Sequence, residues 1–285
     1  MGPRILRLAM ARRDHGLFGP GSATWRVHSS PAVALVGGLR SLIVQSFHPL
    51  AMAGVAQHSD YRERPLKRLQ RTAEYVAVVT FGDTGQAHEI AARVRRVHRP
   101  VKGVDPVTGK PYSAEDPETA LYVHCAEVHS FLAAHRVYAG HRLSAGEEDL
   151  YFEENVRAAE LMGIPAAMVP HSVEAMRHYF ASVQPQLCLS DSARHAIDFV
   201  VDPPRTAELL AYLLPLRVLS RAAVAITPAE LRRMAGLSAS APGNAASWLA
   251  VRAAAAALEL PLARQLPGLV IGKRTTQVAR DALAA

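Results

Sequence analysis

The 285-residue chain has little of what marks disulfide-stabilised, secreted or membrane-spanning proteins. It contains two cysteines, Cys125 and Cys188, too few for a disulfide framework in a chain of this length. Its most apolar stretches, 31–47 and 209–226, are interrupted by arginine, so neither supplies the roughly 20 apolar residues of a membrane-spanning helix. The first residues lack the apolar segment of a secretory signal. We therefore expect a soluble, cytoplasmic protein, and peripheral attachment to a membrane remains open.

Short motifs of several enzyme classes are also missing. The sequence has no Gly-x-Gly-x-x-Gly, His-Glu-x-x-His, Gly-x-Ser-x-Gly or Cys-x-x-Cys, the usual signatures of dinucleotide enzymes, zinc proteases, α/β-hydrolases and thioredoxin-like proteins. No glutamate is followed three residues later by histidine, as ferritin-like di-iron bundles require. The segment from Gly268 to Arg274 resembles a phosphate-binding loop, but it is one residue too short and has Arg where Ser or Thr would hold magnesium.

Positive charge is in excess. The chain has 32 Lys and Arg against 25 Asp and Glu, a formal net charge of +7, while 49% of its residues are hydrophobic. This composition is that of a folded globular protein. A basic surface suits nucleic acid, anionic lipid or an acidic cofactor such as a porphyrin with propionate groups, and charge alone does not choose among them.

The spacing of apolar residues predicts an all-α fold. Apolar residues recur mostly three and four positions apart, and strict alternation is scarce. The segment 102–115 is predicted to be a long loop because it is rich in Gly and Pro. Chain length favours a main helical domain over 15–200 and a helical extension over 201–285 packed on it. Capping signals and proline positions predict helices at 31–47, 65–81, 84–98, 117–136, 145–162, 172–183, 191–200, 206–222 (kinked at Pro215), 228–236 and 247–259.

Two histidines fall on apolar faces of these helices. His98 ends a face that begins at Ala87, and His124 shares a face with Leu121 and Val128. Such a histidine is most often a core imidazole bonded to a carbonyl. A neutral imidazole in an apolar helical pocket is also what a haem iron needs as an axial ligand. No Cys-x-x-Cys-His is present, so any haem would be held without covalent attachment.

A cluster of polar residues opens the predicted helix 65–81. Arg68, Arg71 and Thr72 place two guanidinium groups three residues apart, with a hydroxyl group beside the second. Two arginines on one helix face usually point to solvent. The alternative is that arginines such as these pair with the propionate groups of a haem.

From about residue 18 to 180, the chain resembles the haem b oxygenases typified by the latex clearing proteins and by MpaB of the mycophenolic-acid pathway. The resemblance runs through segments in a fixed order, namely Trp25-Arg-Val-His28, Gln45-Ser-Phe-His48-Pro49, Arg68-x-x-Arg71-Thr72, Phe81-Gly82, His98-Arg-Pro-Val-Lys-Gly103, Tyr112-Ser-Ala, Tyr122-Val-His124 and Gly163-Ile-Pro165.

This resemblance implies a haem b enclosed by helices 65–81, 84–98 and 117–136. In the latex clearing branch the axial histidine follows Val-Arg-x-x, and Val94-Arg95-Arg96-Val97-His98 matches that context. His98 is therefore the expected iron ligand, and His124 is the alternative, otherwise lining the pocket. Arg26, His48 and Arg68 are expected to contact the cofactor. Arg68, Arg71 and Thr72 are the expected catalytic residues.

The arginine box departs from the latex clearing branch, which has lysine in place of Arg71. Lysine can lose a proton and bind iron, whereas arginine stays protonated and has no lone pair to offer. Arg71 is therefore expected to donate hydrogen bonds to an oxygen ligand or to a propionate group. The sequence also has no clear counterpart of the glutamate which that branch places ahead of the box, and this puts polyisoprene in doubt as the substrate.

The expected function is a haem-dependent oxidation of a lipophilic small molecule by dioxygen or peroxide, with alkene cleavage as one form. A second interpretation keeps the haem as a peroxidase or dehydrogenase of a secondary metabolite. A third is a helical binding module, without enzymatic activity, for anionic partners; we expect no specific nucleic-acid partner. The sequence does not indicate the oligomeric state.

Overall fold

The computed structural model describes residues 14–207, 209–259, 268 and 271–283, and these residues form an all-α protein with one small hairpin. The fold class predicted from the sequence is thus confirmed. The main helices are α1 (Ala23–His28), α2 (Pro31–Gln45), α3 (Pro49–His58), α4 (Pro65–Phe81), α5 (Thr84–His98), α6 (Pro117–Tyr138), α7 (Ala145–Leu161), α8 (Val173–Val183), α9 (Asp191–Val201), α10 (Leu213–Ala225), α11 (Ala229–Ala235), α12 (Ala241–Glu259) and α14 (Lys273–Leu283).

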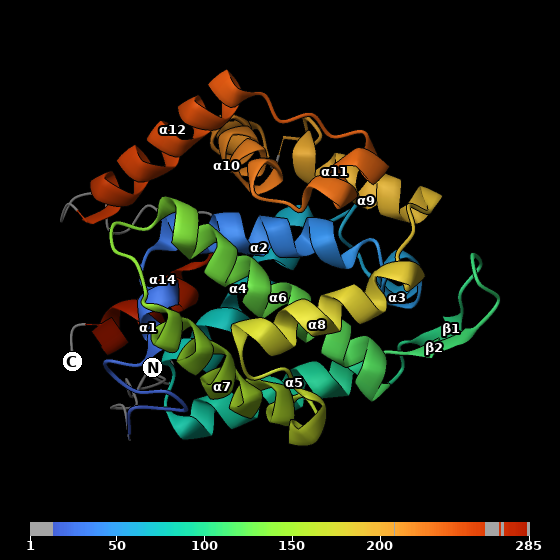
Figure 1. The fold of residues 1–285 in the computed structure, drawn as a ribbon, viewed down its shortest axis with the longest axis horizontal. Coiled ribbons are helices and arrows are strands. Elements are labelled where there is room, and N and C mark those ends of the chain that lie inside the picture. Colours follow the sequence, from blue (N-terminus) through green and yellow to red (C-terminus); the bar gives the residue numbers. More distant parts are fainter. Residues whose placement is uncertain (1–13, 208, 260–267, 269–270, 284–285) are drawn as a thin grey trace, which may run out of the picture.

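The antiparallel helices α2 and α6 form the centre of the molecule (Figure 1). They cross closely at Gly37, where an added Cβ atom would lie 2.9 Å from the Cα atom of Phe131. Arg40 is also buried at this crossing, where its guanidinium group donates to the Ser130 hydroxyl at 2.6 Å and to the Ile226 carbonyl at 2.9 Å. Glycine at the crossing and a buried arginine beside it therefore fix α2 against α6.

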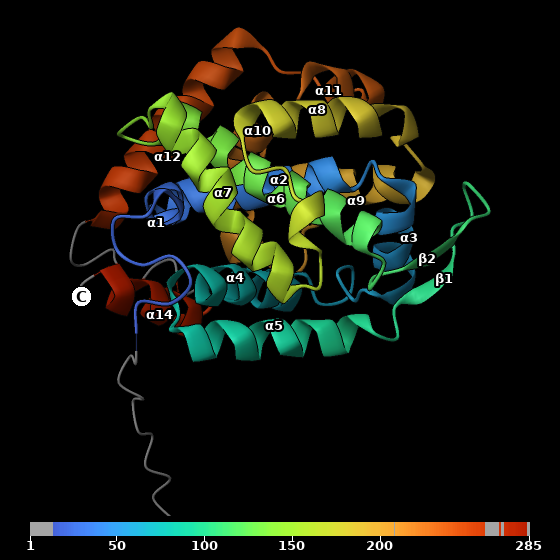
Figure 2. The same cartoon turned by 60° about the horizontal axis from the view of Figure 1, so that its bottom comes forward.

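The other helices lie on either side of this central pair (Figure 2). Helices α4, α5 and α14 pack together on one side, while α10 and α12 pack on the other side, against α2. Much of the chain after residue 200 therefore rests directly on the central helices. Among the described residues, no single helix is both long enough and apolar enough to cross a membrane. Two pairs of consecutive helices are together long and apolar enough, although each pair is sharply bent between its members. These pairs are α2 with α3 and the segment 210–225 with α11.

Local sequence accounts for the ends of these helices. Asp83 accepts a hydrogen bond from the backbone N–H of Gln86, whose side chain in turn accepts one from the backbone N–H of Asp83, so the two form a capping box for α5. Asp116 caps α6 in a similar way ahead of Pro117. Most predicted helices end within two residues of the observed boundaries.

Several predictions about individual elements were wrong. The predicted loop 102–115 contains a two-stranded hairpin, β1 (Lys102–Val104) with β2 (Pro111–Ser113). The predicted helix 206–222 is instead a short 3-10 turn at Leu210–Tyr212 followed by α10. Pro215 lies in the first turn of α10 and causes no kink, because a first-turn residue needs no N–H for the helix. Helices α1, α3 and α14 were not predicted.

Candidate functional site

A large apolar cavity lies between α2, α4 and α6. Its volume is about 1650 Å³, whereas pockets for drug-sized ligands are usually about 300–1,000 Å³. On α6 the lining positions follow the helical period, so one face of this helix forms a wall. These α6 residues are Thr119, Ala120, Val123, His124, Glu127, Val128 and Phe131. Helix α3 contributes several further lining residues, and parts of α5, α7, α9, α10, α12 and α14 contribute others.

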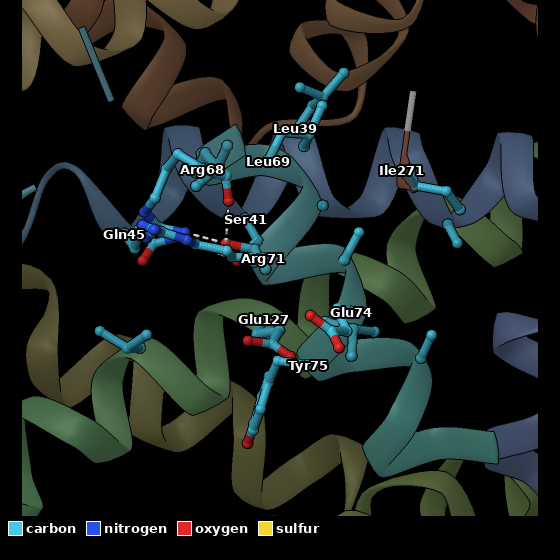
Figure 3. Close-up of a pocket in the computed structure, with 18 of the residues that line it drawn as sticks. Leu39, Ser41, Gln45, Arg68, Leu69, Arg71, Glu74, Tyr75, Glu127 and Ile271 are labelled. Carbon is cyan, nitrogen blue, oxygen red and sulfur yellow. Dashed lines mark hydrogen bonds between the residues drawn. The ribbon is translucent and has the colours of Figure 1, made fainter. Parts of the chain in front are cut away.

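Arg68 and Thr72 bring polar groups to the α4 wall. They lie one turn apart, and the Arg68 guanidinium group donates a hydrogen bond to the Thr72 hydroxyl. Figure 3 shows the Arg68 side chain next to Gln45, which α2 contributes. Burial lowers the pKa of Arg68, and nearby Asp60 opposes this effect. Even with a lowered pKa, arginine remains a cation at neutral pH, so the cavity holds a partly desolvated positive charge.

Arg71 lies at the rim of the cavity rather than deep inside it. Its side chain is 55% exposed, and a guanidinium nitrogen lies 3.8 Å from a carboxylate oxygen of Asp60. The three residues of the predicted box therefore all line the cavity, but Arg68 and Thr72 are the inner pair. Their catalytic roles stay a prediction.

Both candidate iron ligands, His98 and His124, also line the cavity. Burial lowers the pKa of His124 to about 4. Burial, followed by the nearby Arg68 guanidinium, also lowers the pKa of His98, against the opposing effect of Glu115. Both imidazoles are therefore neutral near pH 7 and keep a lone pair on one ring nitrogen. Of the two, His124 has a buried Nε2 atom without a hydrogen-bond partner among the described residues.

The helical period accounts for the position of His98 only in part. The apolar face that begins at Ala87 continues through Ile90 and Ala91, and these three residues are buried, but Val97, directly before His98 on the same face, is 64% exposed. His98 is the last residue of α5 and is half-buried at the edge of the cavity. The choice between His98 and His124 as a ligand stays a prediction.

Two of the expected cofactor contacts do not line this cavity. Arg26 lies in α1, where a guanidinium nitrogen is 2.7 Å from a carboxylate oxygen of Glu147. His48 caps α3, and its Nδ1 atom accepts a hydrogen bond from the backbone N–H of Ala51. These contacts give both side chains a structural explanation, so their placement gives no support to a role as cofactor contacts.

Sequence reasoning missed two polar residues inside the cavity, Glu127 of α6 and Tyr75 of α4 (Figure 3). Neither side chain makes a hydrogen bond or an ion pair with another described residue. Burial raises the pKa of Glu127 to about 7, and burial together with the nearby Glu127 carboxyl raises the pKa of Tyr75. The signal for Glu127 was present, because it follows His124 by three positions on the same helix face.

The described residues contain no group of three or more His, Cys, Asp or Glu side chains placed to hold a metal ion. A macrocycle-bound iron would need only one protein ligand on a given face, and either imidazole in the cavity offers one. The observed constellation is thus an apolar chamber with neutral imidazoles, a buried guanidinium group and an unpaired carboxyl group. These features define a helical protein with a chamber large enough for a small molecule.

Comparison with known families assigns the chain more closely. Residues 25–260 match the family described as "ER-bound oxygenase mpaB/B'/Rubber oxygenase, catalytic domain". The chain belongs to this family, as the sequence resemblance indicated. It is therefore an oxygenase-family protein, and the family indicates an oxidoreductase. Searches of curated proteins and of solved structures found no match.

Proposed function

We propose that the protein is a haem b-dependent oxygenase that acts on a lipophilic small molecule in the cavity between α2, α4 and α6. The proposal rests on one observation: two neutral imidazoles, those of His98 and His124, line an apolar chamber of about 1650 Å³. The volume exceeds that of one ordinary ligand site, which supports binding of both a flat macrocycle and a substrate. His98 and His124 both line the chamber as neutral imidazoles, the Nε2 atom of His124 is buried without a hydrogen-bond partner among the described residues, and either imidazole could hold a haem iron.

Each polar residue of the chamber has a distinct task in this proposal. His98 is the first choice to hold the iron, on the family sequence pattern, and His124 is the alternative. The guanidinium group of Arg68, which donates to Thr72, and that of Arg71 at the rim would pair with propionate groups or donate hydrogen bonds to an oxygen atom. When bound, haem would supply the activation of dioxygen or peroxide.

The chamber wall provides the remaining contributions. The apolar residues of α2 and α6 exclude water and favour a lipophilic substrate. Glu127, with a pKa of about 7, exists in both protonation states near neutral pH and could hold or release a proton at its carboxyl oxygen.

The decisive experiment is purification of the full chain from haem-replete cells, followed by titration of the colourless fraction with hemin. We expect a Soret band and stoichiometric uptake. A protein that stays colourless and takes up no hemin would refute the proposal. Replacing His98 and His124 separately with alanine then identifies the ligand, because only loss of the imidazole that holds the iron removes the spectral signature of a nitrogen ligand. If His124→Ala alone abolishes that signature, the assignment to His98 is wrong.

A further inference from the structure

A basic surface surrounds one mouth of the cavity. Its cations come from the segment before α4, from the first turns of α4, from the end of α5 and from the β1–β2 hairpin, which Figures 1 and 2 show at the same end of the molecule. The cations of this surface, here named the basic rim, are Arg62, Arg64, Lys67, Arg71, Arg96, Arg99, Lys102 and Lys110.

Fewer carboxylates than cations lie at the basic rim. Asp60 and Glu115 lie within 4.0 Å of Arg71 and Arg99, and Glu63 is exposed. At the start of α6, Asp116 caps the helix and Glu118 is exposed. Asp105, in the hairpin, is buried, and its carboxylate accepts hydrogen bonds from the backbone N–H and the hydroxyl group of Thr108. The hairpin therefore presents its two lysines outward while its acid stabilises its own turn. The result is a surface of net positive charge.

Exposed apolar side chains lie among these cations. Val97, Val104 and Val107 are 64%, 60% and 52% exposed, although valine is usually buried. Val97 also lines the cavity, together with exposed His58 and half-exposed Arg71. The cavity therefore reaches the surface within the basic rim, where apolar and cationic groups alternate.

We propose that the basic rim docks on an anionic lipid bilayer and that the cavity mouth within it faces the membrane. Lysine and arginine near an anionic membrane surface each contribute about 1 kcal/mol, or about fivefold in partitioning. Exposed valines would enter the interface between headgroups and acyl chains. A nucleic acid would meet the same charges but would gain nothing from the valines. The inference extends the proposed function, because a lipophilic substrate dissolved in the bilayer would reach the cavity directly.

The test uses co-sedimentation of the full chain with vesicles, which requires no cofactor and is thus independent of the haem proposal. One set of vesicles contains phosphatidylcholine alone, and the other contains equal parts of phosphatidylcholine and phosphatidylglycerol. We expect binding to the second set that weakens with added salt. The variant K102Q/K110Q should lower that partitioning roughly 30-fold.

The control variant R221Q/R233Q removes the same charge from α10 and α11, which Figure 2 shows on the opposite side from α5, and should bind like the wild type. A further variant, V104S/V107S, should weaken binding to vesicles but not to duplex DNA. Equal loss in the two glutamine variants, or equal binding to both vesicle sets, would overturn the proposal. The proposal would also be overturned if V104S/V107S bound vesicles as the wild type does and duplex DNA displaced the protein from the vesicles. That outcome would favour a nucleic-acid partner.

Discussion

The titration of Glu127 tests the structure of the cavity most directly. In the unfolded chain this carboxyl group titrates at its ordinary pKa of 4.5, whereas burial raises the pKa to about 7 in the folded protein. Between these values the folded state keeps a proton that the unfolded state has released, so the free energy of unfolding falls as the pH rises. The difference between the two pKa values corresponds to about 3 kcal/mol, lost between pH 4.5 and just above pH 7.

The replacement Glu127→Gln keeps the shape of the side chain and removes its titration. Urea unfolding of the wild type and the variant, followed by circular dichroism across this pH range, gives the free energies of unfolding. We expect the free energy of unfolding of the variant, relative to that of the wild type, to rise by about 3 kcal/mol between the acidic and the basic end of this pH range. Burial lowers the pKa values of His28 and His124, so these residues change the free energy of unfolding in the opposite direction. As the pH falls, the unfolded state binds a proton at each histidine before the folded state does, and this destabilises the wild type and the variant equally.

The comparison between the two proteins thus isolates the carboxyl group. The matched control is Glu153→Gln, which makes the same replacement at an exposed position of α7, and its free energy of unfolding should follow that of the wild type. If the Glu127→Gln and wild-type curves run parallel at all pH values, the carboxyl group is solvated in the folded protein. The cavity is then not the apolar chamber described above.

Two further replacements test the helices that frame the cavity. Gly37→Ala should destabilise the protein by about 2 kcal/mol in urea unfolding, because the added methyl group would press on the backbone of Phe131. At Gly38 the methyl group would meet open space, so Gly38→Ala should stabilise the protein by about 0.5–1 kcal/mol. Shifts of the same sign in both variants would contradict the close crossing of α2 and α6. Asp83→Ala removes the cap of α5 and should cost about 1 kcal/mol in thermal unfolding, and an unchanged melting temperature would show that the capping box contributes nothing.

Most of the helical fold could be predicted because its signals are local. The cap at Asp83 and the prolines that begin α2, α4 and α6 each act within one turn of their own position. The hairpin could not be found, because three-residue strands are too short to show a period of two. Pro215 misled the prediction because a kink and a first-turn position look alike until the start of the helix is known.

The candidate site was predictable where its residues share one helix face. His124 was placed on the cavity side because the period of α6 continues through Val128 and Phe131, and Arg68 and Thr72 meet because they lie one turn apart. Arg26 and His48 were selected from their sequence segments alone. Their contacts with Glu147 and with the start of α3 depend on tertiary packing, which no local pattern reveals.

The cavity has an energetic cost that a bound molecule would remove. The side chains that line an unfilled apolar chamber lack van der Waals contacts on one side, which destabilises the fold. Each buried polar group without a hydrogen-bond partner lowers the stability by about a further 1–3 kcal/mol. Of the buried side-chain atoms without a hydrogen-bond partner among the described residues, His124 Nε2 and Ser59 Oγ belong to residues that line the chamber, while Arg26 Nε, His135 Nε2 and Arg232 Nε lie elsewhere. Glu127 and Tyr75 line the same chamber and make no hydrogen bond with another described residue, so a bound ligand could satisfy several polar groups there. Replacements that fill the chamber with apolar side chains should therefore stabilise the protein and weaken its binding of that ligand.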